Sequence, residues 1–201
     1  MTNSKSACPQ RRSIRLPGYD YTSPGAYFIT LVAFQRLCLF GVIRDGEVEL
    51  SEEGQLMDEK FREIPDHFPN VELGAFVVMP NHLHGIIILH DVPRRGVVPT
   101  PVGGSPGAID PDDFVGTRNG LNKGDVPSPL PKRPTLGQVV AYYKYQTTKQ
   151  VNAARNTAGM PLWQRNYYEH IIRNEEEYER IYEYIASNPT HWKDDDEYIS
   201  R

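Results

Sequence analysis

The spacing of apolar and polar positions along the chain predicts alternating strands and helices. Four aromatic and β-branched runs are typical of buried strands, at 26–34, 71–79, 82–90 and 167–173. A shorter strand is predicted at 47–50. Apolar residues recur at helical spacing in three segments, 51–65, 135–152 and 175–188.

The ends of these helices are marked by residues that cap or break a helix. Ser51 has the side chain of an N-cap, and Pro65 and Pro189 end two of the helices because proline cannot continue the hydrogen-bond ladder. The helix over 135–152 has one apolar side, formed by Leu136, Val139, Val140, Tyr143 and Thr147.

The order of the predicted elements indicates the fold class. Strand, helix, strand, strand, helix, strand, helix matches an α+β, ferredoxin-like (RRM-like) fold, with one antiparallel sheet and helices on one face. The last helix is an addition to this fold. We therefore expect residues 1–201 to form one domain.

One stretch interrupts the pattern. Residues 93–134 contain nine of the 17 prolines and seven of the 16 glycines, and few apolar residues. Such a composition cannot hold a helix or a strand ladder, so it predicts a disordered insertion within the domain.

Composition and charge narrow the class of protein. No apolar run approaches the roughly 20 residues that span a bilayer, and the polar first residues lack the apolar core of a secretion signal, which predicts a cytoplasmic protein with no membrane partner. The net charge is −4, but cations concentrate in 1–15 and 130–173. A local basic surface for nucleic acid can therefore coexist with an acidic whole, although faces that are merely solvated fit as well.

The segment MPNHLHGIIIL places two histidines on one predicted strand. Side chains at i and i+2 of a strand point to the same side about 6–7 Å apart, so His82 and His84 could hold one metal ion. The alternative is two polar residues on a solvated strand face. Gly85 follows His84, which excludes the HxHxDH pattern of metallo-β-lactamases. His90 lies six residues beyond and is expected outside the site.

The last predicted helix offers a nucleophile and a further ligand. An apolar stripe predicted to face the core is formed by Tyr178, Ile181, Tyr182 and Ile185. Tyr184 and Asn188 lie off this stripe and one turn apart, so a phenol and an amide face the same neighbour. This pairing favours Tyr184 over the other tyrosines of the helix.

Together, MPNHLHGIII and WQRNYYEHIIRNEEEYERIYEYIASNP resemble the single-tyrosine HUH transposases of the insertion-sequence-200-like superfamily, above all the REP-associated tyrosine transposases. The resemblance runs from about Arg11, in RRSIRLPGYDYTSPGAYFIT, to about Trp192, apart from the insertion. It implies that His82 and His84 bind a divalent metal, that Tyr184 is the nucleophile and that Asn188 is the third ligand. Many relatives have glutamine where Asn188 stands.

The same resemblance implies a DNA transposase that cleaves single-stranded DNA through a 5′-phosphotyrosine and transfers the strand. It implies Mg²⁺ or Mn²⁺ as cofactor, a hairpin DNA of the REP type as partner, and a homodimer. Imidazole ligands alone would suit Mn²⁺ or Zn²⁺ better than Mg²⁺.

Several basic and polar residues are candidates for DNA contacts. The helix over 135–152 combines lysines with tyrosines, a mixture suited to single-stranded DNA, although a packed amphipathic helix with solvated lysines fits equally. The candidates are Lys144 and Lys149 on this helix and, by resemblance, Gln164, Arg165, Arg11, Arg12 and Arg15.

Two other readings of the chain remain open. A non-catalytic RRM-like nucleic-acid-binding protein would need no metal and form no covalent product. A metal-dependent phosphoesterase using a metal-bound water would need His82 and His84 but not Tyr184.

Overall fold

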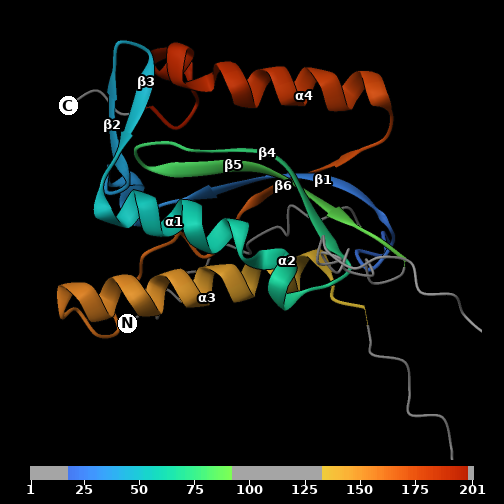
Figure 1. Ribbon diagram of the computed structural model, residues 1–201, viewed down its shortest axis with the longest axis horizontal. Coiled ribbons are helices and arrows are strands. Elements are labelled where there is room, and N and C mark those ends of the chain that lie inside the picture. Colours follow the sequence, from blue (N-terminus) through green and yellow to red (C-terminus); the bar gives the residue numbers. More distant parts are fainter. Residues whose placement is uncertain (1–17, 92–132, 199–201) are drawn as a thin grey trace, which may run out of the picture.

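The computed structural model describes residues 18–91 and 133–198. A central sheet lies between two helical layers, with α1, α2 and α3 on one face and α4 on the other (Figure 1). The bounds in chain order are β1 Gly25–Val32, η1 Phe34–Arg36, β2 Gly41–Arg44, β3 Glu47–Leu50, α1 Glu52–Arg62, α2 Ile64–His67, β4 Val71–Val78, β5 His82–Leu89, α3 Leu136–Arg155, β6 Tyr168–Ile172, α4 Glu175–Ser187 and η2 Asn188–Asp194.

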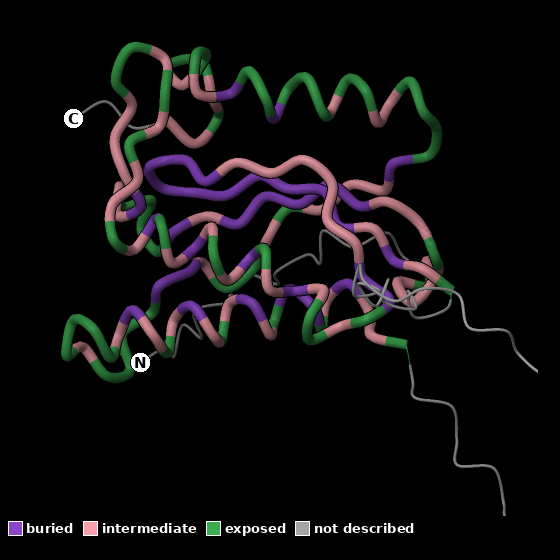
Figure 2. Tube along the Cα trace, viewed as in Figure 1, coloured by how far each residue is buried: buried purple, intermediate pink, exposed green. Residues whose placement is uncertain are grey.

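The main sheet has the strand order β4-β5-β1-β6, and all neighbouring strands are antiparallel. With α1 and α3 as the two connecting helices, this is the ferredoxin-like topology. The predicted fold class is confirmed, as is the addition of a C-terminal helix. β1 and β5 are the two central strands and are the most continuously buried part of the trace (Figure 2).

The β2–β3 hairpin was only half predicted, since the sequence pattern indicated a strand at 47–50 and none at Gly41–Arg44. Asp45 and Gly46 connect the two strands with positive φ angles of 52° and 82°. Two such residues form the turn whose twist suits a two-residue hairpin, and Asp-Gly is a favoured pair there. The hairpin forms a separate two-stranded sheet.

The two faces of the main sheet carry separate apolar clusters. Odd-numbered β5 residues such as Leu83 and Ile87 join the larger core beneath α1 and α3. The even-numbered Ile86 joins a smaller cluster beneath α4, together with Phe28, Ile172 and Ile185. This alternation follows from the two-residue period of a strand, and it places His82 and His84 on the α4 side.

Helix caps and buried faces on the α1 and α3 side agree with the sequence. The Ser51 hydroxyl accepts a hydrogen bond from the Gly54 amide at 3.1 Å, as expected of an N-cap. Thr135 and Gln138 form a capping box at the start of α3. The apolar side predicted for this helix is buried, at Leu136, Val139, Val140, Tyr143 and Thr147.

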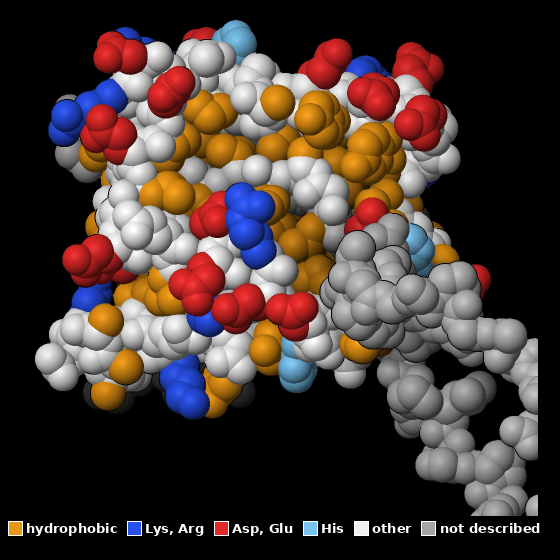
Figure 3. All heavy atoms as spheres, viewed as in Figure 1, with side chains coloured by type: hydrophobic (Ala, Val, Ile, Leu, Met, Phe, Trp, Pro, Cys, Tyr) orange, Lys and Arg blue, Asp and Glu red, His pale blue; other side chains and the backbone are white. Residues whose placement is uncertain are grey.

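The apolar stripe predicted on α4 is correct except for Tyr182. Ile185 is buried, and Tyr178 and Ile181 pack against the cluster beneath the helix, but Tyr182 is 47% exposed. The buried stripe is narrower than predicted because only Tyr178, Ile181 and Ile185 contact the apolar cluster beneath the helix. Figure 3 shows acidic side chains along the outer side of this layer and an apolar band beneath it.

Some expectations fall on parts of the chain that the structure does not describe. These are the disordered insertion at 93–134, except for its last two residues, and the DNA contacts of Arg11, Arg12 and Arg15. Among residues 18–91 and 133–198, no helix combines the length and apolar character needed to cross a membrane.

Gly54 in α1 provides a test of this packing. An added Cβ would overlap the Phe40 carbonyl oxygen and lie 3.0 Å from Leu50 Cδ2. We expect Gly54→Ala to destabilise the protein by about 1–3 kcal/mol, because overpacking outweighs the helix propensity gained by alanine. Thermal unfolding measures the change, with Gln55→Ala at the next, exposed position as the control that should be nearly neutral.

Candidate active site

His82 and His84 are buried side chains on the α4 side of β5. Their exposed fractions are 0% and 3%, which rules out the alternative of two polar residues on a solvated strand face. Their rings lie 4.3 Å apart between centroids. Burying two imidazoles this close together is unfavourable unless their nitrogen atoms have hydrogen-bond partners or bind an ion.

The hydrogen bonds of Asn81 define the protonation of His82. The Asn81 amide nitrogen donates to the carbonyl oxygens of Arg36 at 3.2 Å and Glu197 at 2.8 Å, so its oxygen faces His82. The His82 Nδ1–H therefore donates to Asn81 Oδ1 at 2.9 Å. The lone pair of His82 must then be on Nε2, which is buried and has no hydrogen-bond partner among the described residues.

His84 can present its Nε2 atom in the same way. Its Nδ1 lies 2.9 Å from the Thr30 hydroxyl on the neighbouring strand β1, and this hydroxyl can accept the Nδ1–H. Nε2 then carries the lone pair. Support of the other ring nitrogen is the usual arrangement for histidines that bind a metal.

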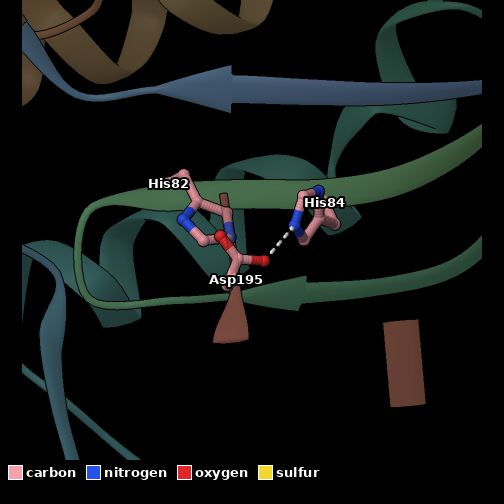
Figure 4. Close-up of side chains that lie close together, drawn as sticks. All are labelled: His82, His84 and Asp195. Atoms are coloured by element: carbon pink, nitrogen blue, oxygen red, sulfur yellow. Dashed lines mark hydrogen bonds and ion pairs between the residues drawn. The ribbon is translucent and has the colours of Figure 1, made fainter. Parts of the chain in front are cut away.

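Asp195 completes the cluster from the C-terminal end of the chain. It follows η2 directly, and its side chain is 1% exposed. Its Oδ1 lies 4.0 Å from His82 Nε2 and its Oδ2 lies 3.4 Å from His84 Nε2. Figure 4 shows both rings on β5 directed toward this carboxylate. One ligand atom from each of the three residues lies within 4.8 Å of the other two.

The donor set fits a divalent cation. His82 Nε2 is unprotonated and lies 4.0 Å from Asp195 Oδ1, so the two atoms share no hydrogen bond. Burial, and then the neighbouring His84, lower the pKa of His82 to about 3, so its ring stays neutral. A neutral imidazole and an ionised carboxylate are the forms that bind metal ions. Two imidazoles with one carboxylate suit Mn²⁺ or Zn²⁺ as well as Mg²⁺.

Tyr184 on α4 places its hydroxyl at the edge of this cluster. The hydroxyl lies 3.2 Å from His84 Nε2 and donates to Asp195 Oδ2 at 3.1 Å. Its ring contacts Phe28 edge-on, and the residue is 44% exposed. Burial, followed by the charge of Asp195, raises the pKa of the phenol. The side chain is thus reachable from solvent while its oxygen is held beside the histidines.

Asn188 lies next to the cluster but contacts it through its amide nitrogen. It is the first residue of η2, is 3% exposed, and donates from Nδ2 to Asp195 Oδ2 at 2.9 Å. Its Oδ1 is buried without a hydrogen-bond partner among the described residues. Burial alone would raise the pKa of Asp195, but the neighbouring His84 and hydrogen bonds from Asn188 and the Glu197 amide hold that pKa below its usual range.

The predicted DNA contacts on α3 are separated from this cluster. α3 lies on the other face of the sheet (Figure 1). The Lys144 ammonium is turned inward and donates to the Gln164, Arg165 and Asn166 carbonyl oxygens, the first at 2.5 Å. Burial lowers its pKa to about 8. The ammonium thus joins α3 to the following loop, and its contact with DNA stays a prediction.

Two residues of the WQR segment, in the loop after α3, make hydrogen bonds within the protein. The Trp163 indole N–H donates to the Thr147 hydroxyl at 2.8 Å, and Trp163 is 6% exposed. Gln164 hydrogen-bonds to the backbone of β1 and the residue after it. Lys149 and Arg165 are exposed, and their DNA contacts stay predictions.

Three residues of the candidate site were missed from the sequence. Asp195 lies in a run of four acids, and nothing in the run distinguishes it from its neighbours. Asn81 and Thr30 support the histidines from outside the HLH segment. Asn81 could have been suspected because it directly precedes His82, but Thr30 is 54 residues away from His84.

Metal binding at this cluster should stabilise the folded protein. A ligand at 100 times its dissociation constant contributes about 2.7 kcal/mol, or roughly 5–10 °C in Tm for a chain of this size. We expect Mn²⁺ to produce a shift of this order in thermal unfolding, and Asp195→Asn to reduce it by more than half. Asp196→Asn, which changes the same charge on the neighbouring exposed residue, should leave the shift intact. An equal shift in Asp195→Asn would place the ion elsewhere.

Comparison with known proteins gives a sequence relative and several solved structures, among them two transposases. No family model matches the chain. It is 36% identical over 202 residues to an uncharacterized protein of Haemophilus influenzae, covering 98% of each chain. A REP-associated tyrosine transposase bound to a REP hairpin is 19% identical with a TM-score of 0.46, over 84% of this chain and 68% of that one. A candidate transposase from Deinococcus radiodurans is 15% identical with a TM-score of 0.41, over 86% and 95%.

Proposed function

This chain belongs to the same family as the uncharacterized Haemophilus influenzae protein, and we propose that it cleaves and rejoins single-stranded DNA. The proposed reaction depends on a metal ion, and Tyr184 is its nucleophile. The proposal includes the transposase function implied by the sequence resemblance. It places this chain among DNA strand transferases that form a 5′-phosphotyrosine.

One observation carries the proposal. The Tyr184 hydroxyl lies 3.1 Å from Asp195 and 3.2 Å from His84, beside the candidate metal ligands. Among the helices of the described residues, no other hydroxyl contacts this cluster. A hydrolase acting through water needs no phenol at this place. A group that is both partly exposed and held against the candidate ligands is suited to attack a phosphate lying on them.

The residues of the cluster divide into ligands and supports. His82 Nε2, His84 Nε2 and Asp195 would hold the divalent cation, with the buried Asn188 Oδ1 as a further donor. When bound, such a cation polarises a phosphate and neutralises the charge that develops on its oxygens. Asn81 and Thr30 fix the ring orientations by hydrogen bonds to the Nδ1 atoms.

The proposed reaction exchanges one phosphate ester for another. The Tyr184 oxygen attacks phosphorus, and its proton passes to solvent, which reaches this partly exposed side chain. The bond between phosphorus and the 3′ oxygen breaks, and this oxygen takes a proton from solvent and leaves as a hydroxyl. The 5′ end remains on Tyr184. The hydroxyl of another strand can reverse these steps and release the tyrosine, so rejoining needs no ATP.

A hairpin with single-stranded flanks is the substrate to test first. The sequence resemblance implies such an element, and the solved REP-associated transposase is bound to a REP hairpin. Incubation of the protein with labelled hairpin DNA and Mn²⁺, followed by a denaturing gel, should reveal a covalent protein–DNA adduct that excess EDTA prevents. Cleavage without an adduct would favour the phosphoesterase alternative. Binding with neither product would favour the binding-protein alternative.

Homodimerisation is proposed separately from the chemistry. β4 and β6 are the two edges of the main sheet, and an edge strand offers unpaired backbone groups to a second copy. Light scattering at micromolar concentration distinguishes a dimer from a monomer.

A further inference from the structure

A cavity of about 660 Å³ lies between the β2–β3 hairpin and the segment that follows α4. Val42 and Ile43 line it from the hairpin, while Trp192 and Tyr198 line it from the C-terminal segment. Figure 1 shows the hairpin beside the end of α4. Gly46 at the hairpin turn approaches Thr190 closely, since an added Cβ would lie 3.2 Å from the threonine methyl group. Both residues are part of the cavity lining.

This cavity shares a wall with the candidate metal ligands. The Trp192 ring lies 5.7 Å from the His82 ring between centroids, and Pro80 of the cavity wall is two residues before His82. Tyr198 packs edge-on against Trp192 at 5.3 Å. Trp192 therefore belongs both to the wall of this cavity and to the surroundings of His82.

We propose that the cavity binds one unpaired base of the DNA strand that Tyr184 cleaves, with the base held against Trp192. The proposal rests on the proposed function and adds a subsite that selects the position of cleavage. Aromatic faces bind unpaired bases of single-stranded nucleic acids by stacking. The cavity is large enough for a base and its sugar, and its apolar walls would remove the face of the base from water.

The polar groups of the lining select a base over a phosphate. Asp45 and Asp194 contribute carboxylates, against the single cation of Lys193. Carboxylates repel phosphate but accept hydrogen bonds from the exocyclic amino groups of bases. The Trp192 indole N–H has no hydrogen-bond partner among the described residues, so a donor is available as well. The lining therefore favours adenine, cytosine or guanine over thymine.

A double-mutant cycle between protein and DNA tests the proposal. Each unpaired nucleotide of the hairpin DNA is replaced in turn by an abasic residue, and binding is measured without metal, so that the result does not depend on cleavage. For wild-type protein we expect one position at which the abasic residue weakens binding roughly 5- to 150-fold, the range for loss of one stacked base. In Trp192→Ala the same abasic residue should have no further effect, because the partner of the base is already lost.

Two further variants keep the test independent of Trp192, whose ring also contacts His82. Val42→Trp fills the cavity from the opposite wall and should give the same loss of sensitivity to the abasic position. Tyr182→Ala removes an exposed aromatic ring on α4, outside the cavity lining, and should retain the wild-type pattern. At the sensitive position, thymine should bind more weakly than the three bases with amino groups.

The outcomes separate this proposal from the proposed function. Additive effects of Trp192→Ala and the abasic residues at every position would overturn the base subsite, even if the covalent adduct forms. A coupled position in a protein that forms no adduct would support the subsite and count against cleavage. The subsite would also be overturned if Trp192→Ala weakened the binding of free nucleoside monophosphates but showed no coupling to any position of the DNA strand.

Discussion

Tyr184→Phe is expected to abolish the covalent DNA adduct completely while the protein still binds DNA. The substitution removes one oxygen, and this oxygen is the atom that lies beside His84 and Asp195. The ring contact with Phe28 is kept. Because the side chain is 44% exposed, stability should change by about 1 kcal/mol or less, the size of one hydrogen bond. Denaturing gels measure the adduct, and thermal unfolding measures stability.

The same helix offers a matched control. Tyr182 is 47% exposed, close to the value for Tyr184, but two residues apart on a helix the two side chains lie on different sides. Tyr182→Phe should therefore keep full adduct formation. An adduct that persists in Tyr184→Phe and disappears in Tyr182→Phe would show that Tyr182, not Tyr184, is the nucleophile. Cleavage at a normal rate in Tyr184→Phe would transfer the role of nucleophile to water.

His82→Gln is expected to eliminate both DNA cleavage and the Mn²⁺-dependent rise in Tm. Glutamine has about the volume of histidine, so it limits the cavity that alanine would leave at a fully buried position. It lacks the imidazole lone pair that His82 directs at Asp195. We expect a loss of stability of roughly 0.5–3 kcal/mol without metal, as for most buried substitutions. Calorimetric titration with Mn²⁺ measures binding directly.

His90→Gln is the control for this change. His90 directly follows β5 and, like His82 and His84, is at an even-numbered position. It hydrogen-bonds to Glu72 at 2.8 Å, at the other end of the strand from the cluster. It was predicted to lie outside the site, and it should tolerate the substitution with metal binding and cleavage intact. Normal Mn²⁺ binding by His82→Gln would remove the HLH segment from the proposed centre.

The sequence by itself determined most of the secondary structure and the fold class. Two-residue and 3.6-residue periods report which side of each element is apolar, and the order of elements leaves few ways to bury those sides together. Local rules therefore predicted the ferredoxin-like sheet, the Ser51 cap and the buried side of α3. β2 was missed because Gly41–Arg44 is short and carries no clear alternation.

The sequence also determined the two local pairs of the site. His82 and His84 share a side of β5 because strand side chains repeat every two residues. Tyr184 on α4 and Asn188 directly after this helix lie on the same side because they are one turn apart. Spacing alone could not decide whether the histidines are solvated or buried. That depends on the layer of helix and C-terminal segment that covers this face of the sheet.

Only the tertiary structure decided which third side chain meets these pairs. Asp195 lies 111 residues from His84, and η2 must turn back over the sheet before its carboxylate reaches the histidines. The inward direction of Lys144 and the cavity beside Trp192 likewise depend on segments far apart in the chain. Periodicity reports the direction of a side chain within its own element, whereas its partners are set by how distant elements pack, and no local pattern records that packing.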